Sequence, residues 1–232
     1  MNPTIIDILG EDYFLISHTG AEEYRDTQIK DAVSVNLLPS LTADFCVRSY
    51  SKNGVLRRFD PIAAVSAAAY LSLKQGLPLD ELVFETPSGL LTVFCTGDGV
   101  FTLTLQKCKV LFTETPEILG CAVSYTDVNV GRVCRVVRAE NITSADPSAL
   151  APLLSVGRYL PDALLFSSIN GGELKILPYA DFNPSPPSRA ELFAATALAY
   201  QERRGEFTAD GGFLIVRAGC SAVDLKIKCE IK

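Results

Sequence analysis

Two segments of the chain combine small and apolar residues with the signals that begin and end helices. The first covers residues 60–75, is rich in alanine and is followed by Gly76. Aspartate is a favoured N-cap, and proline fits the first helical position because no N–H is needed there. Asp60 and Pro61 therefore predict where this helix begins.

The second helical segment covers residues 188–204 and is followed by Gly205. It opens with "SRAE", which has the spacing of a capping box. In such a box Ser188 accepts a hydrogen bond from the backbone of Glu191, and the glutamate side chain accepts one in return. We therefore expect Ser188 to be the N-cap of this helix.

Most of the other apolar residues lie in short runs that are typical of strands. Before the first helix these runs are "YFLIS", "VSVNLL" and "DFCVRSYS", and after it "LVFET", "LLTVFC" and "VFTLTLQ". Before the second helix they are "CRVVRAENI", "ALLFSSI" and "ELKILPYA", and after it "FLIVRA" and "AVDLKIK". Because strands dominate, we expect the α+β class, with each helix packed into a curved, mostly antiparallel sheet.

The two helical segments also resemble each other in sequence. "AAAYLSLKQG" and "ALAYQERRG" match, and each precedes a strand–turn–strand unit. A repeat with a period of about 130 residues indicates duplicated domains rather than a solenoid. We place the boundary near "TETPEILG", so that the predicted halves are residues 1–117 and 118–232.

Charge and composition exclude several classes of partner. The formal net charge is −6, which argues against broad attraction to nucleic acid or anionic lipid. No segment approaches the roughly 18 consecutive apolar residues that span a bilayer, and the first residues lack the features of a secretory signal. We therefore expect a cytoplasmic protein that binds neither nucleic acid nor membrane.

The supply of metal-binding and nucleophilic side chains is small. The seven cysteines are scattered without any C-x-x-C pair, so we expect reduced thiols used for packing, with Cys229 the most exposed by fraying. The only histidine, His18, is interpreted as the end of a strand entering a loop. A zinc site is not expected, nor is a histidine-based triad unless His18 is its base. Arg132, Arg135 and Arg138 are interpreted as surface charge on alternating faces.

The N-terminal segment resembles the diaminopimelate epimerase family. "ILGEDYFLI", with Gly10, Asp12 and Tyr13, is similar to that family's opening strand. "ADFCVRSYSKNG", with Gly54, is similar to its strand leading to an Asn-x-Asp-Gly turn. The helix, "TPSG" and "LLTVFC" follow in the same order, so that the resemblance covers residues 8 to 107. Beyond residue 120 it rests on "ELFAATALAYQERRG" and "DGGFLIVR".

The resemblance implies two pseudo-symmetric halves, each a sheet wrapped around a central helix, with a ligand site in the cleft between them. In that family, loop residues and helix N-termini hold the carboxylate and amine of the substrate. Two cysteines, one at the start of each central helix, remove and return the α-proton without a cofactor. The arrangement is physically sensible, because a helix N-terminus lowers a thiol's pKa and stabilises an anion.

This sequence departs from the family at both cysteines. Where the family has Cys-Gly-Asn-Gly, the chain has Asp60, Pro61, Ile62 and Ala63, and the second cysteine run is matched by residues 188–191. A two-thiol epimerase is therefore excluded. Asp60 remains either a cap or a carboxylate base like that of the phenazine-biosynthesis isomerases, although their Gly-Asn-Pro signature is absent.

The other candidate binding residues follow from the same matches. They are the positions equivalent to substrate-binding residues and their neighbours: Glu11, Ser51, Asn53, Ser188 and Arg189. Arg189 is either a solvated helix residue or an anion-binding group. No metal or cofactor is expected.

Three functions stay open at this point. The leading interpretation is an epimerase-like protein that has lost the thiol chemistry, a pseudoenzyme that binds a small molecule or a protein partner. The alternative is a cofactor-independent isomerase or epimerase that transfers a proton through Asp60. The third is a subunit whose role is oligomerisation, for example as a homodimer.

Overall fold

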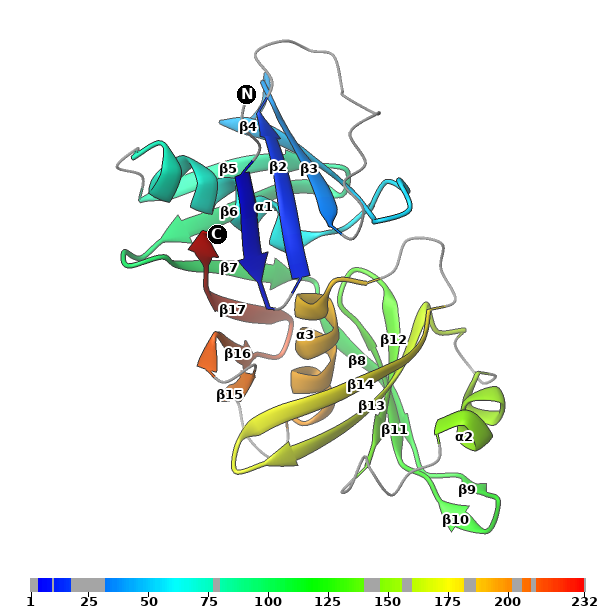
Figure 1. Cartoon of the computed structure of the whole chain (residues 1–232). Coiled ribbons are helices and arrows are strands. Elements are labelled where there is room, and N and C mark those ends of the chain that lie inside the picture. The colour runs from blue at the N-terminus through cyan, green and yellow to red at the C-terminus, as the bar shows by residue number, and fades with distance from the viewer. Residues whose placement is uncertain are drawn as a thin grey trace. The chain divides into compact units, whose positions relative to one another are not determined.

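The computed structural model describes residues 4–9, 11–17, 32–76, 80–139, 147–155, 160–181, 187–201, 206–209 and 212–231. The chain forms two compact units (Figure 1). Unit 1 is Met1–Thr104 with Lys226–Lys232, and unit 2 is Leu105–Leu225. The duplicated halves predicted with a boundary at 117/118 stay a prediction.

Unit 1 is built on a sheet in the order β18-β1-β2-β3-β4-β5-β6-β7. The strands are β1 Thr4–Ile8, β2 Glu11–Ser17, β3 Val33–Leu38, β4 Phe45–Tyr50, β5 Glu81–Thr86, β6 Gly89–Cys95, β7 Val100–Gln106 and β18 Glu230–Ile231. Neighbouring strands are antiparallel except for β2–β3 and β4–β5, which are parallel. The predicted strands of this part are confirmed.

The helix of unit 1 lies in the crossover between β4 and β5. Helix α1, Pro61–Ala69, continues as one turn of π-helix, η1 Tyr70–Lys74. All nine residues of α1 are buried, and the helix contacts β1, β2, β3, β4 and β6. Its alanines fit this position, because small side chains let strands approach a helix on several sides. Gly76, with φ +66°, takes the left-handed conformation that often follows a helix end.

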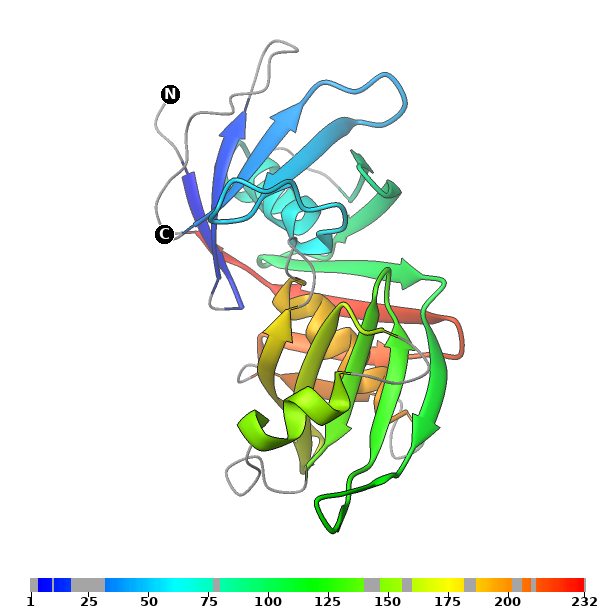
Figure 2. The same ribbon diagram turned by 90° about the vertical axis from the view of Figure 1, so that its right-hand side faces the viewer.

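Unit 2 contains a sheet in the order β17-β16-β15-β14-β13-β12-β11-β8 (Figure 2). The strands are β8 Lys109–Glu114, β11 Tyr125–Asn129, β12 Val133–Arg138, β13 Ala163–Asn170, β14 Glu173–Asp181, β15 Glu206–Ala209, β16 Leu214–Ala218 and β17 Ala222–Lys228. The pairs β12–β13 and β14–β15 are parallel, while β8–β11, β11–β12, β13–β14 and β15–β16 are antiparallel. A separate hairpin pairs β9 Glu117–Ile118 with β10 Cys121–Ala122.

Two helices belong to unit 2. Helix α3, Arg189–Ala199, lies in the crossover between β14 and β15 and contacts six strands of the unit. Its predicted start is right, but it ends at Ala199, five residues before the predicted end; Gly205 lies outside the described residues. Helix α2, Pro147–Leu154, was not predicted, because Pro152 lies inside it and proline is unfavourable in a helix interior.

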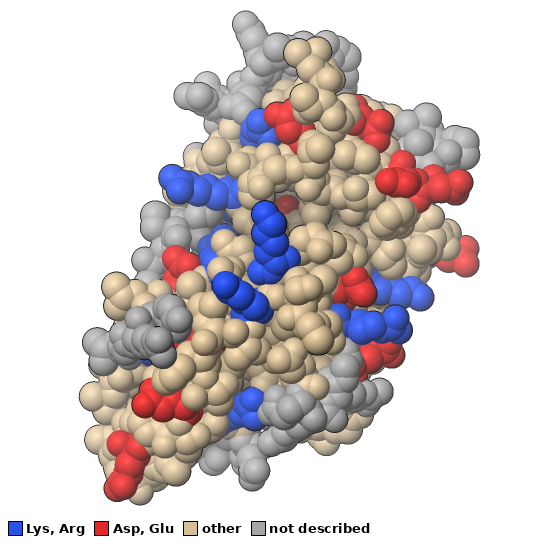
Figure 3. All heavy atoms as spheres, turned by 180° about the vertical axis from the view of Figure 1, so that it is seen from behind, with Lys and Arg blue, Asp and Glu red and all other residues tan. Residues whose placement is uncertain are grey.

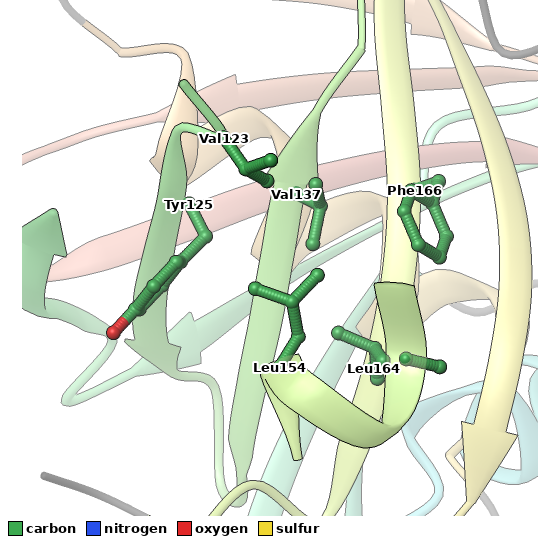
Figure 4. Packing of buried hydrophobic residues seen from close by; sticks show 7 residues of the cluster. Val123, Tyr125, Val137, Leu154, Leu164 and Phe166 are labelled. Carbon is green, nitrogen blue, oxygen red and sulfur yellow. The ribbon is translucent and has the colours of Figure 1, made fainter. Parts of the chain in front are cut away.

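Three strands of unit 2 are buried on both faces. Alternate side chains of β11, β12 and β13 contribute to a hydrophobic cluster with α2, which includes Tyr125, Val137, Leu154, Leu164 and Phe166 (Figure 4). Helix α3 contacts the same three-strand region through β11 and β12. Strands covered on both faces read as continuous apolar runs, as "ALLFSSI" does.

Candidate functional site at the starts of the two helices

Asp60 begins α1 as predicted. Its Oδ1 accepts a hydrogen bond from the N–H of Ala63 at 3.2 Å, and Pro61 occupies the first helical position. This bond satisfies one of the N–H groups that a helix leaves without an intrahelical partner. The carboxylate is 6% exposed, so the cap is part of the protein interior.

The same carboxylate belongs to a buried ionic cluster, which we call the α1 cluster and define as Glu11, Tyr13, Ser49, Arg57 and Asp60. Asp60 Oδ2 accepts hydrogen bonds from the hydroxyl of Ser49 at 3.2 Å and from Nη1 of Arg57 at 3.1 Å. Arg57 Nη2 donates to Oε1 of Glu11 at 2.8 Å, and the Tyr13 hydroxyl donates to Oε2 of Glu11 at 2.9 Å. One guanidinium therefore links two carboxylates.

Burial controls the electrostatics of the α1 cluster. Burial raises the pKa of Asp60, Arg57 lowers it, and the charge of Glu11 raises it further, with a net upward shift. Burial also raises the pKa of Tyr13 well above its usual value, with Asp60 and Glu11 adding to the effect. Burial opposes the charge of Arg57, but Asp60, Tyr13 and Glu11 outweigh it and raise the pKa of that guanidinium. The Nε of Arg57 has no hydrogen-bond partner among the described residues.

The start of α3 carries a second buried ion pair, which we call the α3 cluster and define as Arg132, Ser188 and Glu191. The predicted capping box is present: Ser188 Oγ accepts from the N–H of Glu191 at 3.4 Å, and Glu191 Oε2 accepts from the N–H of Ser188 at 2.7 Å. The other carboxylate oxygen of Glu191 accepts from Nε of Arg132 at 2.8 Å. Glu191 is fully buried and Arg132 is 9% exposed.

The interpretation of Arg132 and Arg135 as surface charge is wrong. Arg135 is fully buried and donates to both carboxylate oxygens of Asp127 at 2.7 Å. The two residues lie directly opposite each other in the β11–β12 pairing. Arg138 is partly buried, donates to the carbonyl of Ala199 and lies over the ring of Tyr200. The spacing of these three arginines along the chain could not reveal their partners, because the partners belong to other strands and helices.

Each predicted binding residue has its own surroundings within its unit, and their role in binding stays a prediction. Glu11 reaches Asp60 only through Arg57. Ser51 accepts a hydrogen bond from the N–H of Val55 within its own turn, and Asn53 is exposed. Arg189 is half-buried, with its guanidinium 5.7 Å from the ring centroid of Phe193. His18 lies outside the described residues.

Arg57 and Arg132 were not predicted to be the partners of the carboxylates at the two helix starts. Arg57 could have been found, because "RRFD" places it three residues before Asp60, and the pair is an i,i+3 salt bridge. Arg132 gave no local signal, since 59 residues separate it from Glu191.

No cysteine lies at the start of α1 or α3. The structure describes all seven, and none forms a disulfide. The expectation that Cys229 is the most exposed is wrong: it is 4% exposed, and burial raises its pKa to about 12. Its N–H donates to the carbonyl of Gly99 at 2.8 Å, which holds this part of the tail against fraying. Cys121 and Cys220 are the exposed thiols.

Three further features concern metal ions, membranes and charged partners. Within the described ranges, no three histidine, cysteine, aspartate or glutamate side chains come together in a way that could hold a metal ion. None of the helices described is long and apolar enough to cross a membrane. Basic and acidic side chains both occur on the face drawn in Figure 3, without either sign covering it. The predicted ligand and homodimer stay predictions.

Comparison with known proteins supports a single fold. No protein-family model and no curated protein matches the sequence. A phenazine biosynthesis protein of the PhzF family from Enterococcus faecalis has a similar structure, with a TM-score of 0.70 at 14% identity over 99% of this chain and 95% of that one. A hydroxyproline epimerase from Agrobacterium vitis gives 0.67 at 13% identity, over 99% and 90% of the two chains.

A protein described as a predicted epimerase from Pseudomonas aeruginosa gives a TM-score of 0.67 at 14% identity, over 99% of this chain and 96% of that one. The chain therefore shares the fold of these PhzF and epimerase structures. At these identities the likeness establishes the fold alone, because one fold hosts many functions.

Proposed function

We propose that this chain is a non-catalytic relative of the isomerases that share its fold, and that it works by binding a small molecule or a protein partner. The observation that carries the proposal is the presence of one of the chain's own carboxylates, buried and paired with an arginine, at the start of each helix. Asp60 pairs with Arg57, and Glu191 pairs with Arg132. Neither position carries a thiol.

The chemistry of helix N-termini supports this proposal. Their backbone N–H groups and dipole attract one anion, which in the related epimerases is implied to be a thiolate or the carboxylate of the substrate. In this chain Asp60 and Glu191 accept some of those N–H bonds, and Pro61 removes another donor. A second anion brought to either position would meet a buried negative charge.

We also propose that the chain arose by internal duplication. Both units repeat the pairing sequence parallel, antiparallel, parallel, antiparallel, through β2 to β6 and through β12 to β16. In each unit the buried helix lies in the second parallel crossover. This shared order supports two pseudo-symmetric halves with a central helix in each.

Exchange of the α-proton is the test of lost catalysis. The purified chain is incubated in D₂O with diaminopimelate, proline or trans-4-hydroxyproline, and the α-proton signal is followed by NMR. We expect no loss of that signal beyond the rate without protein. Exchange that scales with protein concentration and stops when the protein is denatured would contradict the proposal.

A cofactor-independent isomerase acting through Asp60 is the second candidate. The raised pKa of Asp60 favours it, because a carboxyl group with such a shift exchanges protons closer to neutral pH. If exchange is observed, Asp60→Asn should abolish it while Glu81→Gln, at an exposed glutamate, leaves it unchanged. Exchange that survives Asp60→Asn would reject this candidate.

The third function, an assembling subunit, predicts a stable oligomer. Sedimentation velocity over a hundredfold range of protein concentration distinguishes it. A monomer at every concentration would reject it.

A further inference from the structure

A pocket in unit 2 shares no residue with either ionic cluster. It has a volume of about 420 Å³ and lies at the end of β8, beside the β9–β10 hairpin and α2. Its lining consists of apolar side chains, one tyrosine and two carboxylates: Glu114, Pro116, Glu117, Ile118, Leu119, Tyr125, Leu153 and Leu154. The volume falls within the usual range for small-molecule sites, roughly 300–1,000 Å³.

The floor of the pocket is part of the hydrophobic cluster. Tyr125 and Leu154 both belong to it, and Figure 4 shows the Tyr125 hydroxyl directed away from the other labelled side chains. That hydroxyl donates to Oε2 of Glu114 at 2.6 Å. Burial and this hydrogen bond raise the pKa of Tyr125 to about 12, so the phenol stays protonated and keeps Glu114 in place. Arg135 stacks on the tyrosine ring, 4.4 Å from its centroid.

The rim carries two leucines that folding does not explain. Leu119 is 69% exposed at the tip of the hairpin, and Leu153 is 46% exposed on α2. Leu119 and Gly120 have φ values of +53° and +75°, a combination that turns usually meet with Asn-Gly. A leucine in this left-handed conformation is strained, and here it buries little surface. A strained, exposed apolar residue beside a pocket indicates a role in binding.

The negative charge of the pocket favours a cationic ligand. Glu114 and Glu117 are the only charged residues in the described part of the lining, and neither forms a salt bridge with a described residue. Arg135 beneath Tyr125 is already neutralised by its two bonds to Asp127. An anion would therefore meet two carboxylates, whereas a cation would gain charge-assisted hydrogen bonds.

We propose that this pocket binds an apolar organic cation, a primary amine or guanidine attached to an aliphatic or aromatic body. The charged group binds Glu114 and Glu117, and the body lies between Leu119 and Leu153. The inference is independent of the proposed function, since none of these residues belongs to the α1 or α3 cluster.

Three probes with the same six-carbon chain test the charge requirement: hexylammonium, hexanol and hexanoate. Binding to the full chain is measured by ligand-observed NMR titration at low salt. One hydrogen bond to a charged group is worth about 1.5–3 kcal/mol, so hexylammonium should bind at least about tenfold more tightly than hexanol. Hexanoate should bind most weakly.

Variants test whether the binding occurs in this pocket. Glu114→Gln/Glu117→Gln should reduce hexylammonium binding to the level of hexanol, and Leu153→Ala should weaken both probes equally. Glu81→Gln, at an exposed glutamate of β5, removes one charge elsewhere and should change nothing. Circular dichroism and Tm show whether each variant is folded.

Two results would overturn the proposal. One is equal affinity of the unsubstituted chain for hexylammonium and hexanol. The other is an effect of Glu81→Gln as large as that of the double variant, which would mean that only the net charge matters. The α-proton exchange experiment concerns other residues, so its failure and the failure of this site are distinguishable.

Discussion

At the starts of α1 and α3, backbone N–H groups need hydrogen-bond acceptors, and the two helices provide them with different arrangements of charge. At α1 the cap itself is charged: Asp60 accepts from the helix and pairs with Arg57, which also binds Glu11. At α3 the cap is the neutral Ser188, and the charge lies on Glu191, three residues into the motif. The α1 cluster therefore has two carboxylates for one guanidinium, whereas the α3 cluster has one of each.

This difference determines what each cluster loses when a carboxylate is removed. Breaking a buried ion pair is costly chiefly because the remaining charge has no partner. The α3 cluster contains one carboxylate, Glu191, and its pair with Arg132 is almost fully buried. At α1 the guanidinium keeps Glu11 when Asp60 is removed. The α3 cluster should therefore be the more sensitive of the two.

The largest expected effect is that of Glu191→Gln. Glutamine preserves the capping box and the shape of the side chain, but it removes the negative charge that pairs with the buried guanidinium of Arg132. We expect the free energy of unfolding to fall by about 3–5 kcal/mol, the usual cost of breaking a buried pair. Urea unfolding followed by circular dichroism measures it.

A double variant separates the charge from the packing in the α3 cluster. Arg132→Met/Glu191→Gln removes both charges and should be more stable than Glu191→Gln alone, because the buried guanidinium is removed together with its carboxylate. A double variant that is less stable than either single variant would show that the pair contributes net attraction. The explanation given for the greater sensitivity of the α3 cluster would then be wrong.

Asp60→Ala should have a smaller effect than Glu191→Gln, about 1–2 kcal/mol. The loss of an N-cap accounts for about 1 kcal/mol, and the lost bonds to Ser49 and Arg57 add to it. Asp60→Ser restores the cap without the charge and should recover most of the loss. If Asp60→Ala proves as costly as Glu191→Gln, then Glu11 does not compensate Arg57, and the two clusters behave alike.

The capping residues could be predicted from the sequence, while most of their partners could not. Asp60-Pro61 and "SRAE" are local signals, and the helix starts they predict are confirmed. The contacts of Glu11 with Arg57 and of Arg132 with Glu191 span 46 and 59 residues, so they depend on strand order. The pair of Asp127 and Arg135 was within reach, because a short hairpin between "YTDVN" and "VCRVVR" places them opposite each other.

The unequal charge count also predicts a pH dependence for the α1 cluster. The pKa of Asp60 is raised in the folded protein, so the folded state binds more protons than the unfolded state above the unfolded value of about 3.9. The contribution of this residue to stability therefore falls as pH rises from about 4 through the folded pKa.

Asp60→Asn isolates this contribution, because asparagine caps a helix without titrating. The stability of Asp60→Asn relative to the unsubstituted protein should increase as pH is raised from 4, and it should level off above the folded pKa. Urea unfolding of both proteins across this range measures the difference. A difference that shrinks with rising pH would mean that Arg57 outweighs burial.

The smallest expected effect concerns the thiols, whose modification tests another feature that both clusters share, the absence of a cysteine. With a thiol reagent at pH 8, Cys121 and Cys220 should react quickly, because they are exposed. Cys108 and Cys229 should react only after unfolding, since burial raises their pKa values to about 11 and about 12 and leaves little thiolate. Cys121→Ser/Cys220→Ser should remove the fast phase without changing Tm. A fast thiol that persists in this variant would mean that the chain has moved its nucleophile rather than lost it, and the carboxylates at the two helix starts would then no longer argue against catalysis.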